Sequence, residues 1–408
     1  MCSLAALAGC GAESPPANAA EGDLIAADGF EVHVFHPGVG KARHLTVRDN
    51  GDVLVALRNG EVVALRDEDG DGASDQEERR ELPIHTAIEV RGDHLYFADT
   101  VSVSRVALDE GLAPTGEVET VVSDFPDQNQ HAAKTIAFDA DGGLYVNSGA
   151  PSNACQKAMR SPGSPGLDPC PQLERQGGVW RFDAETLGQT QTQDGALYVT
   201  GVRHGLALEW NEDTNALYVT PHGRDQLDTL WPDDFTAEDN AEGPAEEFHK
   251  AAEGDHLGWP FTYYDPRRSE RMLAPEYGGD GETPAEDGLY NDPLYAFPGH
   301  WAPNDMIFFE GEGAPEAYRG GALIAFHGSW NRAPLPQDGF RVSFLPLEDG
   351  VPSGPSKDFL NGFAGVDPIS GPGQARYRPT GLAQGPDGAV YVADSVEGRI
   401  WKVTYAGE

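Results

Sequence analysis

The chain has 408 residues, and its 28 Lys and Arg against 67 Asp and Glu give a formal net charge of -39 at pH 7. So acidic a surface repels a phosphate backbone and an anionic bilayer, which excludes general electrostatic attraction to nucleic acid or to an anionic membrane. The 50 Gly and 31 Pro are typical of many short strands joined by turns, and no long segment has sustained helical periodicity. We therefore expect an all-β protein.

The N-terminus predicts an export signal. Residues 4–11 read Leu-Ala-Ala-Leu-Ala-Gly-Cys-Gly, and a Ser-, Pro-, Ala- and Glu-rich stretch that cannot form a core follows to about residue 21. This resembles the lipobox end of a bacterial lipoprotein signal without its basic n-region, in which Cys10 would carry the lipid; a merely apolar tail is the alternative. We expect residues 1–22 to be a truncated signal and disordered linker, and the protein to be lipid-anchored at the cell envelope, in the periplasm. No other segment is long and apolar enough to span a membrane.

A strand-turn-strand pattern recurs along residues 23–408, which we expect to form one domain. Clear copies lie at 136–146, 206–219 and 382–392, and weaker copies at 45–55 and 88–97. Asp-Gly or Asn between two apolar runs supplies the positive backbone angle of a tight hairpin. Repetition of short antiparallel units predicts a stacked or radial β architecture, and about six such units favour a six-bladed β-propeller with four-stranded antiparallel blades. The six units are expected to begin near Lys41, Ile88, Ile136, Leu206, Asp305 and Pro379.

Two further features belong to this architecture. Residues 29–35 form an orphan strand, and pairing it with the C-terminal strand 398–403 would close the ring and remove an exposed edge.

Long loops rich in Pro, Gly and acidic residues lie near 150–177 and 232–300. Such loops on a rigid β scaffold tend to carry binding and catalytic residues, so we place them on the active-site face.

Residues 67–78 match the calcium-loop pattern D-x-[DN]-x-[DN]-G-x5-E at every specified position. The expected ligands are Asp67, Asp69, Asp71, the carbonyl of Ala73, Asp75 through a water, and a bidentate Glu78. Because an apolar strand at 62–65 precedes it, this loop is expected to join two strands and to hold a structural ion. A solvated acidic turn is the alternative.

Cys155 and Cys170 flank a loop too rich in Pro and Gly to be a regular element. An exported chain favours a disulfide between them, which would stabilise the fold by about 3 kcal/mol for a loop of this size.

His and Arg residues precede three of the expected innermost strands: His131, the pair Arg203 and His204, and the Arg376-Tyr-Arg378 segment. Taken singly, each would be an ordinary surface residue. Loops that enter the innermost strands of a propeller converge at one end of its channel, so we expect these residues to share a site.

Five segments carry a resemblance to a known family. They are residues 131–155 with Gly-Ala-Pro-Ser-Asn-Ala-Cys, 201–207 (Gly-Val-Arg-His-Gly-Leu-Ala), 258–260 (Gly-Trp-Pro), 325–332 (Ala-Phe-His-Gly-Ser-Trp-Asn-Arg) and 376–378. In this order they are similar to the soluble glucose/sorbosone dehydrogenases, six-bladed propellers that use pyrroloquinoline quinone (PQQ) and calcium. The resemblance runs from about Leu24 to the C-terminus. It implies oxidation of an aldose sugar, sorbosone or a related alcohol or aldehyde by hydride transfer to the quinone.

The resemblance also implies roles for single residues. His131 matches the general base, and Arg203 the cation that stabilises charge on the quinone oxygen; His204 stands where the family commonly has Asn. Arg376 and Arg378 match the pair that binds the PQQ carboxylates. The family's cofactor Lys has no clear equivalent, and Asn331 or Arg332 would take its place. The catalytic calcium would be held by the carbonyls of Gly223 and Arg224, supported by Asp228, although relatives often have Pro at position 224. His327 and His300 either line the pocket or pack structurally.

Two other functions fit a six-bladed propeller. A calcium-dependent lactonase-type hydrolase would hold a central calcium with side chains and would not need the Arg pair, whereas a non-enzymatic binding propeller at the envelope would leave His131, Arg203 and that pair unexplained. For the dehydrogenase the sequence has no C-x-x-C-H haem motif. Its electrons would therefore leave to a separate acceptor, a cytochrome or a quinone.

Overall fold

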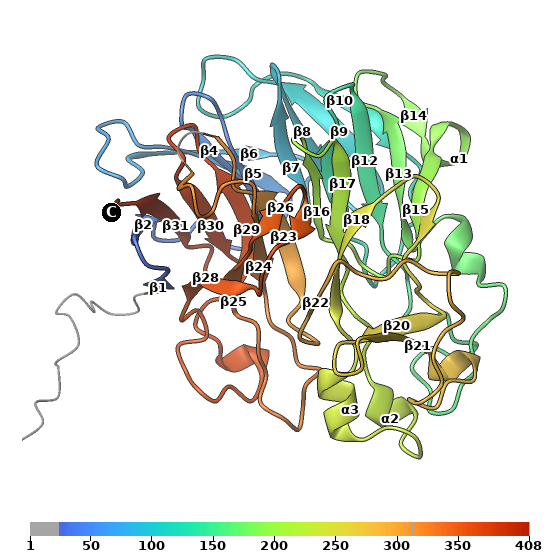
Figure 1. Ribbon diagram of the computed structural model, residues 1–408. Helices are drawn as coiled ribbons and strands as arrows, with labels where there is room; N and C mark the ends of the chain where they lie inside the picture. Colours follow the sequence, from blue (N-terminus) through green and yellow to red (C-terminus); the bar gives the residue numbers. More distant parts are fainter. Residues whose placement is uncertain (1–23, 312–313, 408) are drawn as a thin grey trace, which may run out of the picture.

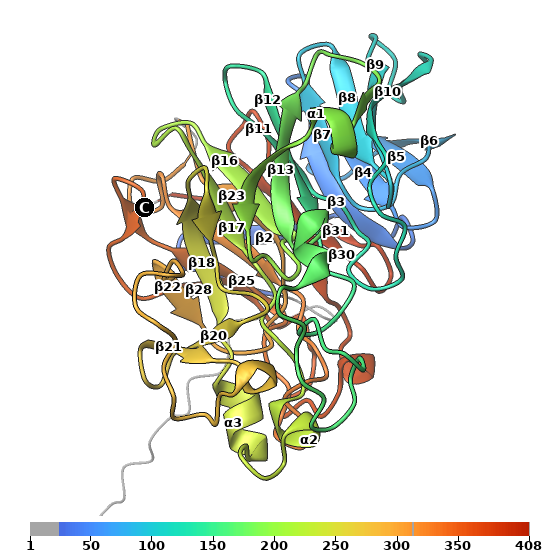
Figure 2. The ribbon, with the colours of Figure 1, turned by 90° about the vertical axis from the view of Figure 1, so that its right-hand side faces the viewer.

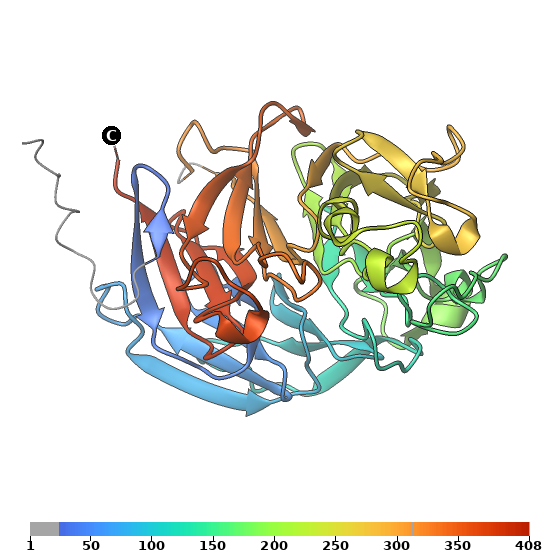
Figure 3. The same cartoon turned by 90° about the horizontal axis from the view of Figure 1, so that it is seen from below.

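The computed structural model describes residues 24–311 and 314–407. Six small antiparallel sheets stand around a common axis (Figures 1 and 3). This confirms the six-bladed β-propeller. The predicted signal, with Cys10, lies outside the described residues. In the part of the chain that is described, no helix has the length and apolarity needed to cross a membrane.

Each blade has four strands, and three blades carry an extra edge strand. Blade 1 consists of β3 (Ala42–Val47), β4 (Val53–Leu57), β5 (Glu61–Arg66) and β6 (Gln76–Glu81). Blade 2 consists of β7 (Ile88–Arg91), β8 (His94–Ala98), β9 (Val103–Ala107) and β10 (Val118–Ser123), with β14 (Gln189–Thr190). Blade 3 consists of β11 (Ile136–Phe138), β12 (Gly143–Ser148), β13 (Gly178–Asp183) and β15 (Ala196–Thr200), with β19 (Asp255–His256).

The second half of the ring repeats this plan. Blade 4 consists of β16 (Ala207–Asn211), β17 (Ala216–Thr220), β18 (Glu246–Ala251) and β22 (Tyr295–Phe297). Blade 5 consists of β23 (Pro303–Phe308), β24 (Ala322–Phe326), β25 (Arg341–Leu345) and β28 (Lys357–Asn361), with β1 (Ile25–Ala26). Blade 6 consists of β29 (Pro379–Gln384), β30 (Val390–Asp394), β31 (Ile400–Tyr405) and β2 (Phe30–His36). The innermost strands β3, β7, β11, β16, β23 and β29 contact one another around the channel and begin within two residues of the predicted starts.

The ring closes in the predicted way, through pairing of the orphan strand with the C-terminal strand. β2 pairs antiparallel with β31, from Phe30 opposite Tyr405 to His36 opposite Ile400. β2 therefore completes the last blade as its outermost strand, and β31 has a neighbouring strand on both sides.

The core lies between the blades. β4 is buried at all five positions because neighbouring blades cover both of its faces, which explains its continuous Val-Leu-Val-Ala-Leu sequence. Alternate side chains of this strand contribute to two different hydrophobic clusters, one on each side of the blade.

The long loops gather at one end of the propeller, the lower end in Figures 1 and 2. There lie α2 (Leu227–Leu230), α3 (Ala237–Glu242) and the hairpin of β20 (Thr262–Asp265) and β21 (Glu270–Leu273). Remaining short elements are α1 (Gln191–Asp194), β26 (Leu347–Glu348), β27 (Val351–Pro352), and the 3-10 turns η1 (Pro171–Glu174), η2 (Pro275–Tyr277) and η3 (Pro372–Gln374). The predicted disulfide between Cys155 and Cys170 is present, with a Cα–Cα distance of 6.1 Å.

Candidate functional site

All six blades bring a His or Arg to the end of the channel where the long loops gather, whereas the sequence singled out three. These residues lie on or just before the innermost strands: Arg43 and His44, His85, His131, Arg203 and His204, His300, and Arg378. His222 follows β17 and His327 follows β24 at the same end. We call this end of the channel the mouth.

His131 is held as a neutral imidazole. Its Nδ1 lies 2.6 Å from the carbonyl oxygen of Ala150, and because a carbonyl only accepts, Nδ1 carries the hydrogen and Nε2 keeps its lone pair. Burial, followed by the charge of Arg203, lowers the pKa of His131 to about 3. The imidazole is therefore a free base across the neutral range, with its basic nitrogen opposite the carbonyl contact.

The His131 ring stacks on the ring of His204, with centroids 4.7 Å apart and planes 25° apart. Gly149 makes room for this pair, because a Cβ on Gly149 would lie 2.6 Å from the carbonyl oxygen of His131 and 3.0 Å from Nδ1 of His204. The side-chain amide of Gln128 donates to the carbonyls of His131 and Gly149, at 3.1 and 2.9 Å. His131 itself has a φ of 51°, a conformation that L residues rarely adopt.

Arg203 is fixed by a buried network around Asp225. Its Nη1 donates to the carbonyl of Gly223 at 2.8 Å, and its Nη2 donates to Asp225 Oδ2 at 2.6 Å and to Asn153 Oδ1 at 3.1 Å. Asp225 also accepts from Arg160 Nη2 at 2.9 Å and from the Asn331 amide. Burial alone would raise the pKa of Asp225, but the charges of Arg203 and Arg160 hold it below its usual range.

Asp225, and not the predicted Asp228, is the aspartate that contacts Arg203. Gln226 takes a left-handed φ of 61° as the N-cap of α2, so the chain turns between the two aspartates. Asp225 stays beneath Arg203, whereas Asp228 lies in the helix and its Oδ1 accepts from the neighbouring backbone amide of Thr229. The sequence offered two aspartates three residues apart and no sign of where the helix begins.

Gly223 and Arg224 follow β17 closely, and the carbonyl of Gly223 contacts Arg203. The Gly223 amide donates to Glu246 Oε2 at 2.7 Å. The buried Arg224 guanidinium points outward and forms a two-point ion pair with the Glu276 carboxylate. A contribution of residue 224 to a metal site would therefore come from its carbonyl.

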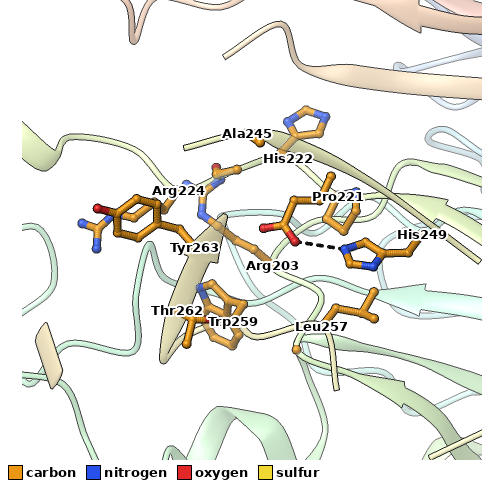
Figure 4. Close-up of a pocket in the computed structure, with 13 residues that line it drawn as sticks. Arg203, Pro221, His222, Arg224, Ala245, His249, Leu257, Trp259, Thr262 and Tyr263 are labelled. Carbon is orange, nitrogen blue, oxygen red and sulfur yellow. Dashed lines mark hydrogen bonds and ion pairs between the residues drawn. The ribbon is translucent and has the colours of Figure 1, made fainter. Parts of the chain in front are cut away.

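Behind Arg203 lies a cavity of about 30 Å³ (Figure 4), bounded by Arg203, His222, Arg224, His249, Trp259 and Tyr263. The dashed contact in the figure joins Glu247 Oε2 to His249 Nε2 at 3.0 Å. A space of this size holds one or two waters and no sugar. This cavity is therefore too small to be the sugar site.

Of the two residues proposed in place of the family Lys, only Asn331 reaches this network. Its amide nitrogen donates to Asp225, and its buried Oδ1 has no hydrogen-bond partner among the described residues. Arg332 instead donates to the carbonyls of Ala241, Gly299 and Pro336 and to the Glu242 carboxylate. Arg332 therefore anchors the end of α3, and its guanidinium donors are already engaged with protein oxygens.

Arg376 and Arg378 do not occupy equivalent positions. Arg378 is half-buried in the mouth, where its Nε and Nη2 donate to the carbonyls of His327 and Gly328 at 3.0 and 2.5 Å. Arg376 is exposed, with its guanidinium carbon 5.2 Å from the centroid of the Tyr377 ring. The structure places Arg378 in the site and Arg376 at its rim.

Three further histidines of the mouth contact protein oxygens. His222 Nε2 contacts the carbonyl oxygen of Pro303 at 2.9 Å, His300 Nε2 that of Asn240 at 2.7 Å, and His327 Nε2 the hydroxyl of Ser395 at 2.7 Å. Burial is the main cause that lowers the pKa values of all three. The mouth is therefore lined by neutral imidazoles between fixed arginines.

The predicted calcium loop joins β5 and β6, as expected. Carboxylate oxygens of Asp67, Asp69 and Asp71 lie within 4.8 Å of one another. Asp75 Oδ2 accepts from the Glu68 amide at 2.8 Å, and Glu78 Oε2 accepts from the Ala113 amide of blade 2 at 3.2 Å. The structure thus brings three predicted ligands together and turns Glu78 toward the neighbouring blade, and the calcium remains a prediction.

Comparison with known proteins identifies the family. Residues 24–406 match the TrAA12-like family. A Coprinopsis cinerea pyrroloquinoline quinone-dependent pyranose dehydrogenase is 29% identical over 168 residues, 35% of this chain and 22% of that protein. The aligned segments span half or less of the length of the curated relatives that the chain matches.

Solved structures establish the fold. The holo PQQ domain of the Coprinopsis cinerea pyranose dehydrogenase superposes with a TM-score of 0.72 at 18% identity, covering 94% of this chain and 98% of that one. The calcium structure of a Trichoderma reesei AA12 enzyme superposes with a TM-score of 0.75 at 17% identity, covering 94% and 97%. These findings confirm the resemblance to PQQ-dependent sugar dehydrogenases, and the chain belongs to the TrAA12-like family.

Proposed function

We propose that this protein is a PQQ- and calcium-dependent dehydrogenase that oxidises an aldose sugar, sorbosone or a related alcohol. The proposal rests above all on one observation, the neutral His131 with its basic Nε2 beside the fixed cation of Arg203. The names of the family relatives, which are PQQ-dependent sugar dehydrogenases, support the same chemistry.

The residues of the mouth fit a planar, polar cofactor. Three of their buried polar atoms have no partner among the described residues: Arg203 Nε, His204 Nδ1 and Asn331 Oδ1. An unpaired buried polar atom is costly, typically about 1–3 kcal/mol, so a ligand that engages these atoms is favoured there. When bound, PQQ supplies the hydride acceptor, and its calcium polarises the accepting carbonyl.

Each residue then has a defined task. His131 Nε2 takes the proton of the sugar hydroxyl, while the Ala150 carbonyl and the His204 ring hold the imidazole in place. Arg203 presents a fixed positive charge to the mouth. Asp225 anchors its Nη2, and its Nε remains available to donate to a ligand. The carbonyls of Gly223 and Arg224 would hold the calcium, and Asn331 and Arg378 would bind polar groups of the cofactor.

The wider setting is part of the proposal. A separate acceptor, a cytochrome or a quinone, would take the electrons, and lipidation of Cys10 would hold the enzyme at the periplasmic face of the cell envelope.

Titration of purified apoprotein with PQQ and calcium tests this function. A dye-linked assay across aldoses, sorbosone and simple alcohols would follow the reconstitution. Saturable activity that requires both PQQ and calcium is expected. If PQQ does not bind at micromolar concentration, the dehydrogenase is rejected, and lactone hydrolysis and then partner binding are the next activities to measure.

The pH profile of the reconstituted enzyme follows from the depressed pKa of His131. A base with an ordinary histidine pKa of 6.5 would lose activity tenfold per pH unit below that value. Because the pKa of His131 lies near 3, its basic form persists as the pH falls, so kcat/KM should stay level between pH 8 and 5. Initial rates at saturating PQQ and calcium measure this, and a tenfold loss per unit beginning near pH 6.5 would contradict it.

Gly149→Ala should disturb the base without touching the substrate. The new Cβ has no room beside His131 and His204, and a displacement of about 1 Å at a catalytic group can cost 100-fold in rate. We expect kcat to fall at least tenfold. Gly371→Ala is the matched control, because a Cβ there meets nothing within 4 Å and the backbone is extended. Equal kcat values for the two variants would show that Gly149 does not position His131.

A further inference from the structure

Blade 1 adjoins blade 6 in the ring (Figure 3), and at the mouth end of this junction the charges of Arg43, Arg58 and Arg378 lie close enough to act on one another. Arg43 lies on β3, Arg58 follows β4 directly, and Arg378 directly precedes β29. The strands β3 and β29 are in close contact, since a Cβ on Gly381 of β29 would lie 2.4 Å from the carbonyl oxygen of Arg43. The amide of Arg58 donates to the Lys41 carbonyl at 3.0 Å, which sets Arg58 beside the start of β3.

Among the residues that the structure describes, no carboxylate forms an ion pair with any of the three guanidinium groups. Within residues 24–311 and 314–407, the side chains of Arg43 and Arg58 make no hydrogen bond or ion pair. Arg378 donates to two backbone carbonyls. The nearby Asp394 carboxylate accepts instead from the backbone amides of residues 378, 396, 397 and 398.

Such a cluster is unusual in a chain with 67 acidic and 28 basic residues, where other arginines pair readily. Arg66 binds Asp52 and Arg105 binds Glu119, for example. Burial, and then the neighbouring arginines, lower the pKa values of Arg43 and Arg378 to about 10. The fold thus holds like charges together at an electrostatic cost that a bound anion would offset.

The cluster is continuous with the candidate active site. Burial lowers the pKa of His327, and Arg378, Arg43 and His222 all lie close enough to it for their charges to lower that pKa further. His222 in turn lies against His204, at 5.0 Å between ring centroids, and His204 stacks on His131. A ligand that extends across the mouth from His131 would therefore reach Arg378 and Arg43.

We propose that Arg43, Arg58 and Arg378 form a carboxylate-binding site in the mouth. Guanidinium groups bind carboxylates through two parallel hydrogen bonds, which suits a fixed anionic group better than a sugar hydroxyl. The carboxylate belongs either to the cofactor, since PQQ carries three, or to an acidic substrate such as a uronate. The choice between these sources rests on the proposed dehydrogenase function, whereas the carboxylate specificity does not.

Calorimetry with benzene-1,3,5-tricarboxylate as the probe tests the site without PQQ. We expect the wild-type apoprotein to bind this probe but not the uncharged benzene-1,3,5-trimethanol, and Arg43→Gln or Arg58→Gln to weaken binding at least tenfold. The exposed Arg58 provides a variant that leaves the packing of the fold intact. Arg319→Gln is the matched control, because this arginine lies in the β23–β24 connection at the opposite end of the propeller.

Two further measurements identify the source of the carboxylate. If it belongs to the cofactor, Arg43→Gln raises the Kd for PQQ, followed by fluorescence quenching, at least tenfold. If it belongs to the substrate, the same variant raises the KM for glucuronate at least tenfold and leaves the KM for glucose unchanged. The proposal is overturned if the wild type does not bind the tricarboxylate, if Arg43→Gln binds it equally well, or if neither the Kd nor the KM changes. If wild-type protein does not bind PQQ, the dehydrogenase function fails, and the probe comparison alone decides the carboxylate site.

Discussion

His131→Ala is expected to reduce kcat by about 10²–10⁴-fold, the usual contribution of a general base. The imidazole is held neutral, its Nδ1 hydrogen is committed to the Ala150 carbonyl, and Nε2 is the nitrogen that can take a proton. The Kd for PQQ should change less than threefold, because the cofactor contacts proposed above come from Arg203, Asn331 and Arg378. Single-turnover kinetics in the reconstituted enzyme, together with fluorescence titration of PQQ, measure both quantities.

Chemical rescue of His131→Ala with added imidazole distinguishes a chemical role of His131 from a structural one. Added imidazole should restore part of the activity of His131→Ala, since a free base can enter the space that the ring leaves, and should not affect the wild type. His33→Ala is the control, because His33 lies partly exposed on β2, and its kcat should equal that of the wild type. If His131→Ala loses PQQ binding in proportion to its rate, His131 holds the cofactor and is not the base.

The fold could be predicted because its signals are local. Asp-Gly and Asn turns fix each hairpin within about a dozen residues, and the repetition of the hairpin gives the number of blades. The orphan strand predicted at 29–35 needed a partner strand, and the edge of the last blade was available for pairing. The disulfide followed in the same way from two cysteines that flank one loop.

The site was harder to predict because its most important contacts join residues that are far apart in the sequence. Arg332 carries the right charge for a carboxylate, but α3, 90 residues earlier, takes up its hydrogen bonds. Asp225 reaches Asn331 from 106 positions away. Arg43 lies at the start of the first hairpin and has no motif around it, so only the closure of the ring, which brings β29 beside β3, reveals it.

Asp225→Ala is expected to destabilise the fold by about 3–5 kcal/mol, the cost of removing one partner from a buried ion pair. Arg203 would remain buried without its counterion, and Arg160 and the Asn331 amide would lose the same acceptor. Asp228→Ala is the direct control. Asp228 is partly exposed in α2 and its side chain accepts from the adjacent backbone amide, so we expect a change below about 0.5 kcal/mol.

The pH dependence of the free energy of unfolding shows whether the charge of Asp225 is what stabilises the fold. The pKa of Asp225 is lowered in the folded state from an ordinary value of 3.8, so its ionised form stabilises the fold fully above pH 3.8, and this contribution is lost as the pH falls toward the folded pKa. Asp225→Asn keeps the shape of the side chain without its charge. In urea unfolding, the difference in the free energy of unfolding between wild type and this variant should therefore be constant from pH 7 to 5 and should become smaller below about pH 4. If this difference in the free energy of unfolding stays the same below about pH 4, then shape and hydrogen bonding, and not the charge on Asp225, hold Arg203 in place.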